Sequence, residues 1–175
     1  MYPLLTILIL FLAAVLETTF IPHLAIWGVE PSLVLIIVLS WSILANGKKA
    51  LTWALLGGLF LDLFSGLPFG VFTLSFVIVA YLTNLVAYNI LDKANLLVVS
   101  SIGLIGTITA NLLMRLFLKL ANLVHLSSLT IEFNFFRLVL LEAIYNTILI
   151  LGIFWLLKQL KQWLSTRQGR ISLPY

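Results

Sequence analysis

Six runs of apolar residues, separated by short polar segments, organise this chain of 175 residues. A run of about 20 apolar residues forms a helix long enough to cross the hydrocarbon core of a bilayer. The pattern therefore predicts an all-α fold, a bundle of six transmembrane helices over residues 1–157 followed by a basic amphipathic tail over residues 158–175. The predicted spans cover approximately residues 3–20, 31–45, 50–64, 71–91, 96–120 and 137–157.

Prolines and glycines mark the ends of several spans. Pro22 ends the first span, Pro31 is expected at the first helical position of the second, and Gly47 is expected as the helix C-cap after it. The second and third spans are short for a full crossing, so we expect irregular turns at their ends. The longest connection, residues 121–136, is apolar enough to lie on the membrane surface.

The composition places the chain in lipid. Hydrophobic residues make up 62% of the sequence and charged residues only 9%, whereas a soluble domain needs a more polar exterior. The absence of cysteine excludes a disulfide framework, a cysteine-based zinc site and an iron–sulfur cluster. The formal charge of +4 does not by itself indicate nucleic acid, and we expect no nucleic-acid partner.

The distribution of basic residues predicts the orientation. With the N-terminus in the cytoplasm, the inner loops and the tail hold seven basic residues: Lys48, Lys49, Lys93, Lys158, Lys161, Arg167 and Arg170. The outer side holds Arg115, Lys119 and Arg137. Cytoplasmic loops carry the excess of lysine and arginine, so both termini are predicted to be cytoplasmic. We interpret the basic tail as an anchor to anionic lipid; recruitment of a cytoplasmic partner is the alternative.

Five charged residues are predicted to lie at similar depth near the outer ends of the spans. Glu17, Asp62, Arg115 and Arg137 fall at span ends, and Glu142 lies just over one turn further in. A charge inside the membrane costs a few kcal/mol when it is left alone, so these side chains are expected to pair. The cluster is either an ion-pair network that fixes the helices, which we favour, or an outward-facing pocket for a polar ligand.

A glycine pair and a turn follow one another around Asp62. Gly57 and Gly58 remove side chains, which allows close helix packing or, if they face lipid, the docking of a partner helix. The turn contains Ser65, Gly66, Pro68 and Gly70. Proline fixes φ and glycine adopts positive φ without strain, so this segment is predicted to reverse the chain tightly.

Signatures of catalysis are absent from the sequence. It contains no His-Glu-x-x-His, no Gly-x-Ser-x-Gly and no phosphate-binding glycine loop. His23 and His125 are its only histidines, and without a third ligand they do not indicate a metal site. We predict no enzyme activity, no catalytic residue, no metal and no cofactor.

The chain resembles the MreD family of bacterial rod shape-determining membrane proteins. The most specific match is the segment Gly57-Gly58-Leu59-x-x-Asp62-Leu63-x-Ser65-Gly66-x-Pro68-x-Gly70. Supporting matches are Glu17-Thr18-Thr19 with Pro22 (many members carry Gln in place of the Glu), Gly28-x-x-Pro31, Tyr81 and Glu142-x-x-Tyr145-Asn146.

The resemblance implies a non-enzymatic component of the cell-elongation machinery in the bacterial inner membrane. Such a protein is expected to bind the single-pass membrane protein MreC and to link cytoplasmic MreB filaments with the enzymes that synthesise the wall. The family also resembles the six-helix substrate-binding subunits of energy-coupling-factor vitamin transporters. A transporter subunit that captures a small molecule is therefore the alternative function.

Overall fold

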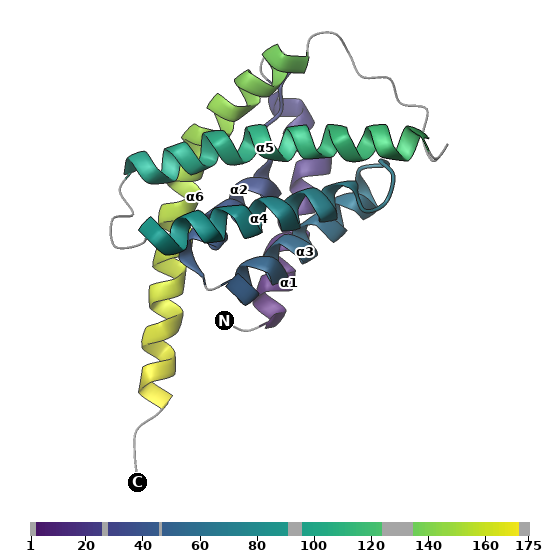
Figure 1. Ribbon diagram of the computed structural model, residues 1–175. Helices are drawn as coiled ribbons and strands as arrows, with labels where there is room; N and C mark the ends of the chain where they lie inside the picture. Colours follow the sequence, from purple (N-terminus) through teal and green to yellow (C-terminus); the bar gives the residue numbers. More distant parts are fainter. Residues whose placement is uncertain (1–2, 26–27, 46, 91–95, 124–134, 172–175) are drawn as a thin grey trace.

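The computed structural model describes residues 3–25, 28–45, 47–90, 96–123 and 135–171. It confirms the all-α prediction: the elements are α1 (Pro3–Thr19), the short 3₁₀ helix η1 (Ile21–Leu24), α2 (Leu33–Leu44), α3 (Gly47–Phe64), α4 (Val71–Ile90), α5 (Leu96–Leu123) and α6 (Phe135–Ile171) (Figure 1). α5 and α6 are long and apolar enough to cross a membrane by themselves. Large apolar side chains on their surfaces are exposed, Leu97 by 78%, as expected for helices that face lipid.

The short helix α2 is the centre of the bundle. Its residues from Val34 to Ile43 are buried without interruption. It contacts α1, α3, α4, α5 and α6. A helix that is apolar on every side either faces lipid or is surrounded by other elements, and α2 is surrounded.

The length of α2 creates a problem at its ends. Its 12 residues span about 18 Å, whereas the hydrocarbon core of a bilayer is about 30 Å thick. The terminal N–H and C=O groups of a helix lack partners within the helix itself. Because α2 is too short to reach water on both sides of a membrane, other parts of the protein must satisfy these groups.

Two predicted helix ends were wrong. Gly47 is the first residue of α3 and not the C-cap of α2, which is Ala45. Instead α2 ends at Leu44, and the N–H of Ala45 donates to the carbonyl of Trp41 at 2.9 Å. Pro31 is not at the first helical position, because Ser32 is in an extended conformation and α2 begins after it.

The turn between α3 and α4 has the predicted backbone conformation. Gly66 and Gly70 have φ values of 69° and 99°, which residues with a Cβ rarely adopt. Between them, the carbonyl of Pro68 accepts a hydrogen bond from the N–H of Val71 at 3.4 Å. This reversal returns α4 along α3, so that the two helices pack against each other.

Gly57 and Gly58 lie inside the bundle, where neighbouring helices approach closely. A Cβ at Gly58 would lie 2.4 Å from the Cα of Thr73 on α4, and one at Gly57 would lie 2.8 Å from the Val34 side chain on α2. The glycine pair therefore serves contacts between helices of this chain and does not form a lipid-facing surface.

The last helix continues well beyond the predicted sixth span. α6 runs without interruption from Phe135 to Ile171 and extends past the other helices at its C-terminal end (Figure 1). Lys161, in the predicted tail, donates a hydrogen bond to the carbonyl of Leu44 at the end of α2. The first part of the tail is thus a continuation of α6 that contacts the bundle.

The close approach of α3 and α4 predicts that Gly58→Ala destabilises the protein. The new methyl group would meet the backbone at Thr73, which cannot move aside as a flexible side chain does. We expect a loss of about 1–3 kcal/mol, the usual effect of overpacking. The matched control is Gly152→Ala on α6, where no heavy atom lies within 4 Å of the added Cβ. Unfolding curves in mild detergent that coincide for the two variants would contradict this packing.

Candidate functional site at the N-terminus of the central helix

The N-terminus of α2 is capped by a carboxylate from α1. Ser32, the N-cap residue, makes no capping hydrogen bond with its own side chain. Instead, Glu17 in the last turn of α1 accepts hydrogen bonds from the backbone N–H of Val34 at 2.7 Å and from the Ser32 hydroxyl at 2.9 Å. A carboxylate at this position also interacts favourably with the positive end of the helix dipole.

A buried amide from α6 completes the cap. The side-chain oxygen of Asn146 accepts a hydrogen bond from the backbone N–H of Ser32 at 3.0 Å. Its side-chain nitrogen donates to the Thr107 hydroxyl on α5 at 3.3 Å and to Glu142 at 3.4 Å. Asn146 and Thr107 are fully buried, so this one amide joins α2, α5 and α6 inside the bundle.

Glu142 extends the network toward the surface. Its second carboxylate oxygen accepts a hydrogen bond at 3.2 Å from Asn111, which also donates to the carbonyl of Thr107 at 3.1 Å. Glu142 and Asn146 are four residues apart, as are Thr107 and Asn111, so each pair shares one helix face. The two helices α5 and α6 therefore meet through a matched set of polar side chains.

A pocket of about 330 Å³ lies beside this network. Its lining residues come from several helices and from the segment before α2: Glu17, Gly28, Val29, Glu30, Pro31, Ser32, Phe72, Asn111, Met114, Leu138 and Glu142. Three of them are glutamates, and the described lining includes no lysine or arginine. Among the described residues, no group of three or more His, Cys, Asp or Glu side chains is arranged to hold a metal ion. The acidic lining of the pocket suits a cation or a hydrogen-bond donor.

Asp62 caps a second helix, α4, in the same manner. Its carboxylate accepts hydrogen bonds from the backbone N–H groups of Phe72 at 2.9 Å and Thr73 at 3.1 Å, and from the Thr73 hydroxyl at 2.5 Å. The end of α3 disfavours a negative charge, but the start of α4 favours one. The packing of α4 on α3 thus explains why an acidic side chain is buried at this position.

Side chains from other helices also satisfy the C-terminal end of α2. Asn84 on α4 donates hydrogen bonds to the carbonyls of Ser42 and Ala45, each at 2.9 Å. Lys161 donates to the carbonyl of Leu44. Both ends of the central helix are therefore held by polar groups that reach it from α1, α4 and α6.

The structure brings together two of the five charged residues predicted as a cluster. Glu17 and Glu142 line one pocket, whereas Asp62, Arg115 and Arg137 are not among its described lining residues. Arg115 is half-buried on α5, and Arg137 is exposed at the start of α6. The hydrogen bonds described for Glu17 and Glu142 come from amides, a hydroxyl and a backbone N–H. Pairing of the acids with the arginines stays a prediction.

Sequence reasoning assigned no role to the neutral side chains that bond to these carboxylates, to one another or to the helix ends. The main ones are Ser32, Thr73, Asn84, Thr107, Asn111 and Asn146. Isolated amides within long apolar runs were the available signal, because a polar group in an apolar environment needs a partner. The identity of each partner could not be inferred, since the partners lie up to 114 residues apart in the sequence.

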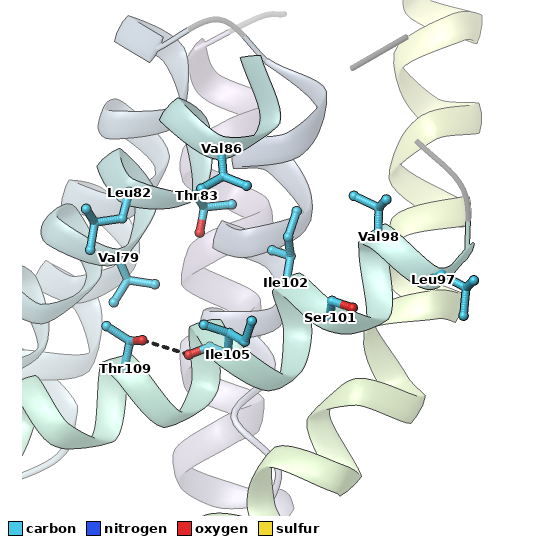
Figure 2. Close-up of a pocket in the computed structure, with 11 residues that line it drawn as sticks. Val79, Leu82, Thr83, Val86, Leu97, Val98, Ser101, Ile102, Ile105 and Thr109 are labelled. Carbon is cyan, nitrogen blue, oxygen red and sulfur yellow. Dashed lines mark hydrogen bonds between the residues drawn. The ribbon is translucent and has the colours of Figure 1, made fainter. Parts of the chain in front are cut away.

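A separate groove of about 420 Å³ lies between α4 and α5 (Figure 2). Figure 2 shows Val79, Leu82, Thr83 and Val86 on the α4 side and residues from Leu97 to Thr109 on the α5 side. Apart from a few hydroxyl groups, its lining is aliphatic. The hydroxyl of Thr109 donates to the carbonyl of Ile105 at 2.8 Å, so it needs no outside partner.

Comparison with known proteins gave one family. A family model described as rod shape-determining protein MreD matches residues 1–160, from α1 into the second half of α6. No curated protein and no solved structure matches the chain.

The two carboxylate caps predict different responses to amide substitution. In Glu17→Gln, the amide oxygen can accept from Val34 while the NH₂ group donates to the Ser32 hydroxyl, which can rotate to accept. In Asp62→Asn, the NH₂ group must face a backbone N–H of Phe72 or Thr73, and a backbone donor cannot rotate. We expect Glu17→Gln to be nearly neutral and Asp62→Asn to lose about 1–3 kcal/mol, the usual effect of an unsatisfied buried group.

Chemical unfolding in mild detergent measures both variants, and Glu17→Leu provides the control that removes both acceptor oxygens of Glu17 from the first cap. Equal losses for Glu17→Gln and Asp62→Asn would contradict this description of the caps.

Proposed function

The chain belongs to the rod shape-determining protein MreD family, and on that premise we propose that it is a non-enzymatic membrane scaffold of the bacterial cell-elongation machinery. Membership of this family implies a role in determining rod shape, as a structural component of the cell-elongation machinery. We propose further that the protein binds a single-pass, MreC-like partner. Through this partner it links cytoplasmic MreB filaments to the enzymes of peptidoglycan synthesis.

The observation that carries this proposal is the family match over residues 1–160. The use of the polar side chains supports it. Glu17, Asp62 and Asn146 each accept hydrogen bonds from the first residues of a neighbouring helix, so they hold the bundle together. A scaffold must keep its helices in a fixed arrangement, whereas an enzyme needs polar groups that are free to bind a substrate.

We propose that the partner's transmembrane helix occupies the groove between α4 and α5. The groove is lined by aliphatic side chains with Ser101 and Gly106 among them, and small residues allow close approach of a helix in a membrane. Most of the described residues lie in helices, so helix surfaces are the contact surfaces that the described part of the chain offers to a membrane partner. The glycine pair at Gly57 and Gly58 is internal, which leaves this groove as the better docking place.

The alternative function is that of a substrate-binding subunit of an energy-coupling-factor-type transporter. The pocket of about 330 Å³ beside Glu17, Glu30 and Glu142 supports it, because it could hold a small molecule with a positive charge. The two functions differ in their partners: a transporter subunit assembles with ATPase subunits, and a scaffold with a single-pass protein.

Site-specific photo-crosslinking in the membranes of a rod-shaped host tests the proposal. A crosslinker in place of Ile105, 62% exposed in the groove, should capture a single-pass membrane protein. The matched control replaces Ile148 on α6, an isoleucine that is 65% exposed and lies outside the groove. Depletion of the protein should also round the cells without impairing vitamin uptake.

The possible outcomes test the scaffold function and the docking of the partner in the α4–α5 groove separately. Purification with a single-pass partner but crosslinking from Ile148 would place the partner elsewhere and leave the scaffold function intact. Recovery of a pair of transporter ATPases, with normal cell shape on depletion, would overturn the scaffold function.

The proposed orientation places both termini in the cytoplasm. The contact between Lys161 and Leu44 puts α6's C-terminal extension and α2's C-terminus at one end of the bundle, close to Lys48. A cysteine at Lys48 should therefore resist an impermeant thiol reagent in intact cells. A cysteine at Phe69, in the exposed turn between α3 and α4, should react. The reverse labelling pattern would invert the orientation.

A further inference from the structure

A third pocket, of about 350 Å³, lies near the opposite end of the bundle from the three glutamates. It is formed by the first half of α1, the second half of α2 and the first half of α3. Thr6, Trp41 and Trp53 are buried at its floor, and Ile7, Lys49 and Thr52 are exposed at its rim. The proposed scaffold function does not use this pocket.

The floor contains a hydrogen-bond donor without an acceptor. Trp41 is only 3% exposed and stacks on Trp53, with ring centroids 4.5 Å apart. Its indole Nε1 is buried, and it has no hydrogen-bond partner among the described residues. A buried indole N–H usually finds an acceptor, so this donor is an exception that a bound acceptor would explain.

The rim carries a positive charge that its own helix does not stabilise. Lys49 follows Lys48 in the first turn of α3, and this turn contains no acidic residue. The helix dipole already makes this end positive, so two lysines here are unfavourable for the helix alone. A bound anion would offset both the lysine charges and the dipole.

The pocket also has an apolar side that continues onto the lipid-facing surface of the bundle. Ile7 lines it, and the neighbouring α1 residues Leu4, Leu8 and Phe11 are exposed. On α3, Lys49, Thr52 and Trp53 lie three and four residues apart and so share a face. A ligand in this pocket therefore meets a cation and hydrogen-bond donors at one end and aliphatic surface at the other.

We propose that this pocket binds an anionic phospholipid, with its phosphate at Lys49 and the Trp41 indole and its first acyl carbons against Ile7. Lysines at the cytoplasmic surface attract anionic lipids. The volume lies within the range of about 300–1,000 Å³ that is usual for ligand pockets. This binding is independent of the MreC-like partner, so either proposal can fail alone.

Lipid retention by the purified full-length protein tests the proposal. The protein is washed in non-ionic detergent, supplied with phosphatidylglycerol, phosphatidylcholine or inorganic phosphate, and examined by native mass spectrometry. We expect retention of phosphatidylglycerol alone. Lys49→Gln should reduce this retention about five-fold, which corresponds to the loss of one lysine near anionic lipid. Lys48→Gln removes the same charge beside the pocket but outside its lining, so it should reduce retention clearly less than Lys49→Gln does.

Trp41→Phe tests the indole N–H directly. It also removes part of a buried ring that stacks on Trp53, so it should lower the unfolding temperature of the lipid-free protein through the cavity left behind. Retention is therefore compared on the folded fraction, where phosphatidylglycerol retention should still fall because the unpartnered N–H is gone. Equal retention of phosphatidylcholine, or equal losses in Lys48→Gln and Lys49→Gln, would overturn the proposal. Binding of inorganic phosphate with the same preference for Lys49 would assign the pocket to a soluble phosphate instead. If Trp41→Phe does not fold, the comparison of phosphatidylglycerol retention between Lys48→Gln and Lys49→Gln tests the proposal by itself.

Discussion

The structure depends on one constraint, the need to satisfy both ends of a short helix that is buried on all sides. α2 has 12 residues, its middle ten are buried, and it contacts the other five α-helices. Its terminal N–H and C=O groups cannot be left without partners in an apolar environment. Glu17 and Asn146 satisfy one end, and Asn84 and Lys161 the other. These side chains come from α1, α4 and α6, so the arrangement of the bundle follows from the requirements of its centre.

The same principle explains the acidic residues at the helix ends. Glu17 lies in the last turn of α1 and caps α2, while Asp62 lies in the last turn of α3 and caps α4. Each carboxylate is placed where one helix stops and the next begins, and each neutralises the positive end of the following helix dipole. The tight turn after Asp62 and the glycine pair before it bring α4 close enough to be capped. The segment from Gly57 to Gly70 is therefore one structural unit of packing, capping and chain reversal.

This use of polar residues bears on function. When buried carboxylates and amides serve to position helices, the surfaces that remain for other molecules are the grooves between helices. The α4–α5 groove is aliphatic and suits a membrane helix, while the pocket at Trp41 and Lys49 combines donors, a cation and apolar surface. The chain belongs to the MreD family, and these two surfaces are the ones that we propose hold other membrane components.

The sequence by itself determined the all-α class, the approximate positions of the six helices and the tight turn at Gly66 and Gly70, because apolar run length and turn-forming residues are local signals. It also singled out Glu17, Asp62 and Glu142, because acidic residues within apolar runs are conspicuous. Only the tertiary structure decided their partners. Every helix has unpaired backbone N–H groups at its start, so the sequence does not indicate which helix a given carboxylate caps. Glu17 could be assigned to α2, and Asp62 to α4, only once the packing of the helices was known. The exact start of α2 depended on these contacts as well, because Asn146, 114 residues away from Ser32, supplies the acceptor at its first turn.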